Sequence, residues 1–240
     1  MVMIIRNANV YAPEHLGRTD VLLLGGTIAA VGQNLKADFG GAVEVTELDG
    51  SDLVLTPGFI DSHEHIIGGG GEGGFHTRTP EASLTDLTTN GITTVVGCIG
   101  TDGVARHMES LLAKARGLEE EGITTYVYTG SYQVPAHTLT GSLMKDIMML
   151  DKVIGAGEIA ISDHRSSQPT FEEFARIAAD VRVGGMLSGK AGVVNVHLGD
   201  SPRMMDLILR VVRETEIPYT QFLPTHVNRN EALFCQAIQF

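Results

Sequence analysis

Short apolar segments alternate with helical patterns over residues 57–240, and this alternation most limits the folds that the chain can adopt. Counting Pro57–Ile60, apolar segments recur at 91–100, 123–130, 158–163, 192–200 and 223–228. Between them, residues 104–122 and 170–185 have apolar side chains at helical spacing. Strands that are separated by helices and buried on both faces form parallel sheets. We therefore predict an α/β fold built on about six parallel strands.

Polar side chains follow nearly every one of these segments. A doubly wound sheet concentrates its chemistry in one crevice, whereas a (β/α)8 barrel collects residues from the ends of many strands. The distribution therefore favours a TIM-like (β/α)8 barrel over residues 57–240. Because the chain stops inside the pattern of a sixth helix, we expect a barrel truncated after about six β/α units. An incomplete barrel predicts that the chain is a fragment, or that a partner supplies the missing β/α units.

Residues 1–56 have a different pattern: short segments of alternating apolar and polar residues are separated by Gly, Asp and Asn turns. They predict a small β-domain, the N-terminal part of a β-sandwich-like unit. The whole chain of 240 residues is 43% hydrophobic and 19% charged, so a packed core is expected.

Charge and cysteine content narrow the partners and the compartment. The formal net charge of -12 argues against nucleic acid and anionic membranes as partners. The two cysteines form no CxxC motif, and the N-terminus has no signal-peptide pattern, so we expect a cytoplasmic protein without disulfides.

Four histidines at predicted strand ends indicate a metal site. His63 and His65 share one face of their strand because side chains alternate with a period of two. His197 and His226 end two later strands, and Glu158 stands at the start of the predicted fourth strand. Imidazole and carboxylate groups bind zinc and similar ions, and four histidines with one bridging anion suit two metals. The alternative for His63 and His65 is a pair of polar histidines at a strand end without a function, and for His197 or His226 alone it is a hydrogen-bonded core position.

Several motifs together resemble a known family. PGFIDSHEH, GGGGEGG, SDHRSS and LPTHVNRN are similar to those of isoaspartyl (β-aspartyl) dipeptidases of the amidohydrolase superfamily, and the resemblance covers almost the whole chain. It implies an amidohydrolase-type barrel that uses two Zn²⁺ per subunit, or other divalent metals. It also implies hydrolysis of β-aspartyl dipeptides, and a homo-oligomer in the complete form.

The resemblance also assigns roles to single residues. It makes His63 and His65 ligands of one zinc and His197 and His226 ligands of the other, with Glu158 in place of a bridging carboxylated lysine. Tyr132 matches the tyrosine that polarises the scissile carbonyl. The implied substrate-binding residues are Glu72 for the α-amino group and Thr101, Arg165 and Arg229 for carboxylates.

The residues themselves support part of this assignment. Arg165 and Arg229 are suited to bidentate recognition of carboxylates in an otherwise acidic chain. Their alternative is a structural ion pair with Asp102 or Asp163. Glu72 lies between glycines, which suggests a mobile loop or a backbone close to a ligand.

One expected catalytic group has no counterpart in the chain. In the family, an aspartate that ends the eighth barrel strand binds metal and shuttles a proton, so we expect this chain alone to be inactive. Two alternatives stay open. One is another amidohydrolase acting on a cyclic amide, as dihydroorotases and hydantoinases do, and the other is a non-catalytic metal-binding fragment. Glu72 separates the enzymes, because cyclic amides have no free α-amine.

Overall fold

A computed structural model describes residues 1–240, which divide into two compact units, Met1–Gly58 and Phe59–Phe240. The first unit contains strands β1 (Val2–Tyr11), β2 (His15–Leu24), β3 (Thr27–Gly32), β4 (Val45–Asp49) and β5 (Val54–Leu55). The strands of the second unit are β6 (Phe59–Glu64), β7 (Ile92–Gly97), β8 (Thr124–Thr129), β9 (Val153–Ile161), β10 (Val193–Leu198) and β11 (Phe222–Thr225). Its helices are α1 (Leu84–Thr88), α2 (Met108–Glu120), α3 (Leu143–Met149), α4 (Phe171–Ser188), α5 (Asp206–Glu214) and α6 (Glu231–Gln239). Three short 3-10 turns are η1 (Phe75–Thr77), η2 (Tyr219–Gln221) and η3 (Val227–Arg229).

The first unit is a single mixed sheet with the strand order β3-β2-β1-β4, and β5 also pairs with β1. β1, β2 and β3 pair antiparallel, while β4 and β5 run parallel to β1. The buried residues Ile5, Ala8, Val10 and Val21 form its small apolar core. These strands make one sheet, so the sandwich-like arrangement expected for residues 1–56 stays a prediction.

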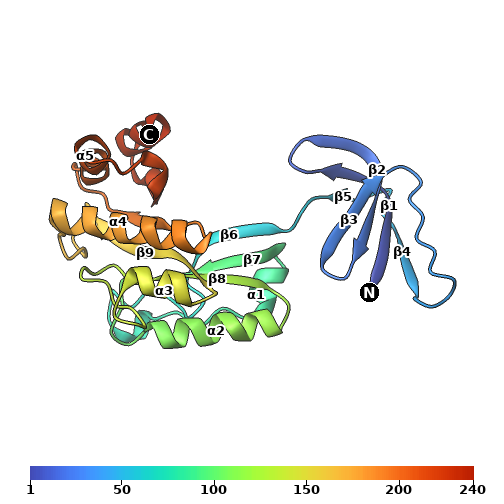
Figure 1. The fold of residues 1–240 in the computed structure, drawn as a ribbon, viewed down its shortest axis with the longest axis horizontal. Coiled ribbons are helices and arrows are strands. Elements are labelled where there is room, and N and C mark those ends of the chain that lie inside the picture. Colours follow the sequence, from blue (N-terminus) through green and yellow to red (C-terminus); the bar gives the residue numbers. More distant parts are fainter. The chain divides into compact units, whose positions relative to one another are not determined.

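The second unit contains one sheet of six strands in the order β11-β10-β9-β8-β7-β6, and every pairing is parallel. The spatial order follows the chain order, and helices lie between successive strands (Figure 1). This is the arrangement of part of an amidohydrolase-type barrel, and it confirms the predicted fold class. The carboxyl ends of all six strands meet at one edge, where a barrel of this kind carries its active site.

The predicted start of the fourth strand was wrong. β9 begins at Val153, so Glu158 is its sixth residue and not its first. The two glycines in this strand allow close approach to β10. A Cβ on Gly155 would lie 2.3 Å from the carbonyl oxygen of Val193, and one on Gly157 would lie 2.7 Å from Asn195. The tight strand pairing therefore requires glycine at both positions.

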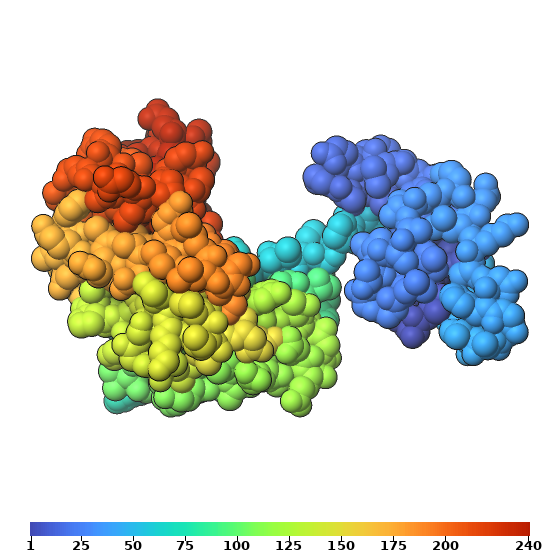
Figure 2. Space-filling model, in the orientation of Figure 1, coloured from blue at the N-terminus to red at the C-terminus, as the bar shows by residue number.

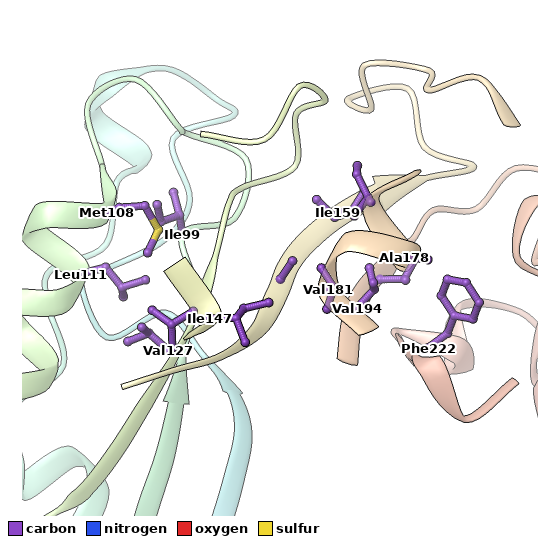
Figure 3. Packing of buried hydrophobic residues seen from close by; sticks show 14 of the residues in the cluster. Ile99, Met108, Leu111, Val127, Ile147, Ile159, Ala178, Val181, Val194 and Phe222 are labelled. Carbon is purple, nitrogen blue, oxygen red and sulfur yellow. The ribbon is translucent and has the colours of Figure 1, made fainter. Parts of the chain in front are cut away.

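Helices cover the sheet and bury a continuous apolar core. Figure 3 shows Met108 and Leu111 of α2 close to Ile99, which follows β7, and Val181 of α4 close to Val194 of β10. All five residues are at most 3% exposed. Full burial of each such side chain contributes about 1.5–3 kcal/mol relative to exposure. The core therefore holds the strand ends in place.

Capping hydrogen bonds and a glycine determine where the longest helix, α4, begins and ends. Thr170 caps α4 by accepting from the backbone N–H of Glu173, whose carboxylate accepts in return from the Thr170 backbone. Gly189, at φ 67°, ends the helix in the left-handed region that favours glycine. Figure 2 shows the side chains of α3 and α4, in yellow and orange, packed against each other. No helix of the chain is both long enough and apolar enough to cross a membrane.

Candidate metal centre

Glu158 is the centre of the predicted site. Its side chain is fully buried, and the four predicted histidines surround it. Oε1 lies 2.7 Å from Nδ1 of His197 and 3.0 Å from Nε2 of His226. Oε2 lies 3.4 Å from Nε2 of His63 and 3.8 Å from Nε2 of His65. The five side chains therefore come together around the two oxygens of one carboxylate.

The donor atoms form two groups that share Glu158. One group joins it to His63, His65 and Cys98, and the other joins it to His197 and His226. Within each group the ligand atoms lie within 4.8 Å of one another. Nitrogen and oxygen donors in such groups are typical of zinc and related divalent ions.

Two buried atoms in the first group lack any hydrogen-bond partner: Nε2 of His63 and Oε2 of Glu158. A buried polar atom without a partner costs about 1–3 kcal/mol. A cation between the two atoms would satisfy both. The residues present therefore fit divalent metal ions held around Glu158.

The outer nitrogen of three histidines has a protein partner. Nδ1 of His63 lies 3.1 Å from Oδ1 of Asn195, and Nε2 of His197 lies 2.9 Å from Oδ2 of Asp163. Nδ1 of His65 lies 3.6 Å from Sγ of Cys98. Such partners orient the ring and determine which nitrogen is left for a metal.

The buried carboxylate and the histidines of the cluster shift one another's pKa. Burial acts to raise the pKa of Glu158, but hydrogen bonds from His197 and His226 outweigh it and lower the pKa. For His63, burial acts to lower the pKa, yet the neighbouring carboxylate raises it. Burial lowers the pKa of His65. Glu158 is therefore ionised at neutral pH, as a bridging ligand must be.

His226 adopts an unusual backbone conformation. It lies directly after β11 with φ 60° and ψ 26°, in the left-handed region that residues other than glycine rarely occupy. Residues held in this region occur often at functional sites, where the surrounding structure sustains the strain. The conformation places the His226 ring against His63 and His197, with ring centroids 5.4 and 4.6 Å away.

Tyr132 lies in the segment after β8 and reaches the same cluster. Its hydroxyl lies 2.7 Å from Nδ1 of His197. Burial and the nearby Glu158 carboxylate raise the pKa of Tyr132. The hydroxyl therefore keeps its proton at neutral pH and is able to donate a hydrogen bond.

Arg165 and Glu72 form an ion pair beside the histidines, with Nη1 of Arg165 3.0 Å from Oε1 of Glu72. Thr101 donates to the same oxygen at 2.9 Å. Arg229 donates to the carbonyl oxygen of Leu198 at 2.7 Å and lies 3.4 Å from Nε2 of His197. The structure thus brings all the predicted substrate-binding residues to the edge that carries the histidines.

Asp163 was not predicted as a site residue, although it was named as a partner for an arginine. It accepts from Nε of Arg165 at 3.0 Å and from Nη2 at 2.8 Å. The Arg165 guanidinium lowers the pKa of Asp163. Since Asp163 also contacts His197, it positions both a histidine and an arginine. The other suggested partner, Asp102, pairs instead with Arg78.

Arg106 was also missed by the sequence analysis. It is 4% exposed and donates to the carbonyl oxygens of Ile67, Gly69, Gly70 and Thr79. These carbonyls belong to the glycine loop that carries Glu72, so Arg106 holds this loop in place. No local pattern identified it, because all four acceptors lie at least 27 positions away.

Cys98 is the third residue that the sequence analysis left out of the site. It lies directly after β7, is fully buried, and belongs to the group of His63, His65 and Glu158. Burial raises the pKa of the Cys98 thiol well above its ordinary value. The four remaining histidines of the barrel unit, at 76, 107, 137 and 164, belong to neither group.

The sheet of parallel strands and its histidine–glutamate cluster define the class of protein as the amidohydrolase superfamily. A solved dihydroorotase has the same fold at a TM-score of 0.60 and 17% identity, with 99% of this chain and 63% of that chain covered. A beta-aspartyl dipeptidase from Fervidobacterium islandicum AW-1 matches at 52% identity and a TM-score of 0.95, over 100% of this chain and 65% of that one. Over its whole length the chain is therefore similar to the beta-aspartyl dipeptidases of the amidohydrolase superfamily.

A second structure of the Fervidobacterium enzyme, in complex with the dipeptide beta-Asp-Leu, matches at 53% identity and a TM-score of 0.94. It is covered to 62%, so the chain spans somewhat less than two thirds of these relatives. Among curated proteins, a dihydroorotase from Lactiplantibacillus plantarum is 27% identical over 186 residues, which are 77% of this chain and 40% of that protein. An Escherichia coli allantoinase is 39% identical over 89 residues, 36% of this chain and 18% of that protein. No family model matches the chain.

Proposed function

We propose that this chain carries the metal-binding and substrate-binding part of an enzyme that hydrolyses the isopeptide bond of β-aspartyl dipeptides. The observation that carries the proposal is the convergence of four histidines on one buried glutamate, next to the Glu72–Arg165 ion pair. The 52% identity to a beta-aspartyl dipeptidase supports it, as does the beta-Asp-Leu complex of that relative.

In this proposal His63, His65, His197 and His226 would hold two Zn²⁺ ions or other divalent metals. His63 and His65 would serve one site and His197 and His226 the other, and Glu158 would be the ligand common to both. When bound, such ions would supply polarisation of the scissile carbonyl and a lower pKa of water. Asn195 and Asp163 hold the rings of His63 and His197 by their outer nitrogens.

The charges beside the cluster complement a β-aspartyl dipeptide. This substrate has one ammonium group and two carboxylates when its second residue is leucine. Glu72 is assigned to the ammonium group, and Arg165, Arg229 and Thr101 are assigned to the carboxylates. Charged hydrogen bonds of this kind are stronger than neutral ones and give directional recognition.

Hydrolysis forms a bond between the water oxygen and the carbonyl carbon and then breaks the C–N bond, with a proton passing to the departing nitrogen. Negative charge develops on the carbonyl oxygen before the C–N bond breaks. Tyr132 is assigned the role of donating its hydroxyl proton in a hydrogen bond to this oxygen. Donors placed where charge develops lower the barrier without reorganisation.

The first test measures zinc content and dipeptide binding on the same sample. We expect the purified chain to bind zinc, and the zinc-loaded chain to bind beta-Asp-Leu. Dihydroorotate should not compete. Preferential binding of dihydroorotate would support the cyclic-amide alternative, which the similarity to dihydroorotase and allantoinase keeps open. Zinc binding without affinity for either compound would support a non-catalytic metal-binding protein.

The proposal includes the compartment, the oligomeric state and the partners of the protein. Both cysteines are free, and Cys98 is buried, which suits a reducing cytoplasm. The resemblance to the dipeptidases supports a homo-oligomer in the complete form. The net charge of -12 makes nucleic acid and anionic membranes unsuitable as partners.

A further inference from the structure

His65 occupies a narrow space at the carboxyl end of β6. A Cβ added at Gly100 would lie 2.6 Å from Cε1 of the ring, and one at Gly69 would lie 3.4 Å from Cδ2. The backbone therefore confines the ring at two points. The remaining question is what determines which ring nitrogen carries the proton.

The thiol of Cys98 lies at the outer nitrogen of this ring. Its Sγ is 3.6 Å from Nδ1 of His65 and 3.6 Å from the carbonyl oxygen of Glu64. The backbone N–H of Cys98 donates to the same carbonyl oxygen at 2.9 Å, which holds the two segments together. On the opposite edge of the ring, Nε2 faces Glu158 at 3.8 Å.

The donors and acceptors at these contacts suggest one proton arrangement. A carbonyl oxygen only accepts, so the thiol proton is directed at Glu64. The sulfur is then left to accept from Nδ1–H of His65. With its single proton on Nδ1, the neutral imidazole presents a bare Nε2 toward Glu158.

We propose that Cys98 is a positioning residue that keeps His65 in the tautomer whose Nε2 is free to bind a metal. His63 has the same arrangement, because the amide oxygen of Asn195 accepts from its Nδ1. An independent observation points to a ligand in this space. The buried atoms Nε2 of His63 and Oε2 of Glu158 are both without a partner there.

This proposal rests on the metal centre proposed above but not on the identity of the substrate. Metal-binding histidines commonly donate their second N–H to a carboxylate, a carbonyl or water, and loss of that partner weakens metal binding about 10- to 100-fold. Here the acceptor is a thiol. The competing role for Cys98 is direct ligation as a thiolate, which the experiment below distinguishes.

The experiment compares zinc affinity among four variants by competition with a chromophoric chelator. Cys98→Ala should weaken one of the two zinc sites about 10- to 100-fold. Cys98→Ser, which keeps a donor and an acceptor, should recover most of that loss. Val96→Ala truncates a neighbour in the same buried cluster and Cys235→Ala removes the exposed cysteine, so both should bind zinc as the unmodified chain does.

Two spectroscopic measurements separate positioning from a structural effect. Nitrogen NMR of the metal-free chain should show His65 protonated at Nδ1, and Cys98→Ala should shift it to a mixture of tautomers. Substitution with Co²⁺ should give no sulfur-to-cobalt charge-transfer band. Such a band, or an unchanged tautomer and unchanged zinc affinity in Cys98→Ala, would overturn the proposal. If the unmodified chain binds no zinc, the metal centre itself is refuted, and the tautomer measurement still decides whether Cys98 orients His65.

Discussion

Nη1 of Arg165 lies 3.0 Å from Oε1 of Glu72, although 93 positions separate the two residues in the chain. Hydrogen bonds from its own backbone N–H, from Thr101 and from Arg165 lower the pKa of Glu72, so its carboxylate is ionised at neutral pH. The two charges neutralise each other when no ligand is bound. A dipolar substrate with an ammonium group and carboxylates would replace this one ion pair by two.

The first prediction concerns Glu72→Gln, which removes the charge and keeps the shape. Removal of one partner from a buried charge pair costs about 2–5 kcal/mol in binding, which is a factor of about 30 or more. We discount this toward its lower end because the Glu72 side chain is 40% exposed. Calorimetry on the zinc-loaded chain should therefore show about 30-fold weaker binding of β-Asp-Leu.

The N-acetylated dipeptide gives the internal control for this prediction. It lacks the ammonium group, so Glu72→Gln should bind it no more weakly than the unmodified chain does. Arg229→Met should lose affinity for both compounds, and the exposed Glu109→Gln should change neither. Equal losses on both compounds in Glu72→Gln would mean that Glu72 does not bind the amine, and the cyclic-amide alternative would gain support.

The second prediction concerns the bridge. Glu158→Gln replaces the carboxylate that lies between the two groups of histidines by a neutral amide. At least one of the two expected zinc equivalents should be lost, because no other carboxylate belongs to both groups. Metal analysis of the purified variant checks this, with circular dichroism to confirm folding. A variant that retains both metals would show that Glu158 is not the bridge.

The third prediction is the pH dependence of zinc binding. The raised pKa of His63 means that a proton competes with zinc up to a higher pH than for an ordinary histidine. Zinc affinity should therefore rise between pH 6 and 8, by up to about tenfold per pH unit for each proton displaced. Replacement of His76, which belongs to neither metal group, should leave this slope unchanged. A flat profile would contradict the prediction.

The contribution of His63 to the stability of the metal-free chain should change with pH in the opposite direction to the zinc affinity. A histidine with a raised folded-state pKa stabilises the fold fully below its unfolded value of about 6.5. This stabilisation is lost as the pH rises through the raised value. The contribution of His63 to the unfolding midpoint, measured against His63→Asn, should therefore decrease from pH 6 to 8 without zinc.

The fourth prediction concerns the loop that carries Glu72. Arg106→Lys keeps the charge but cannot reach the carbonyls of Ile67, Gly69, Gly70 and Thr79 with one compact ammonium group. Each lost hydrogen bond from a charged donor costs about 1.5–3 kcal/mol. Hydrogen exchange over residues 68–79 should accelerate by about tenfold or more.

The exposed arginine Arg116, which pairs with Asp151 at the surface, provides the matched control. Arg116→Gln should leave exchange in residues 68–79 unchanged, because exposed ion pairs contribute about 0–1 kcal/mol. Unchanged exchange in Arg106→Lys as well would mean that the loop is held by its own backbone contacts.

The sequence by itself determined the alternation of strands and helices and the places where polar residues follow a strand. Both depend on local properties, the period of two in a strand and of 3.6 in a helix, which hydrophobic spacing reveals directly. For this reason His63, His65, His197 and His226 could be assigned to one edge before the structure was known. The start of α4 was equally readable, because the helical spacing of apolar side chains begins at residue 170.

Only the tertiary structure decided how the site is held. Glu158 was expected at the start of its strand, but β9 begins at Val153, and its glycines allow the close approach of β10. Arg106 and Cys98 lie outside the recognised motifs, and Asp163 lies within SDHRSS but was not assigned to the site. Their roles come from contacts with segments 27 or more positions away, apart from the local Asp163–Arg165 pair. Such contacts depend on where packing places whole strands, and no local pattern encodes that.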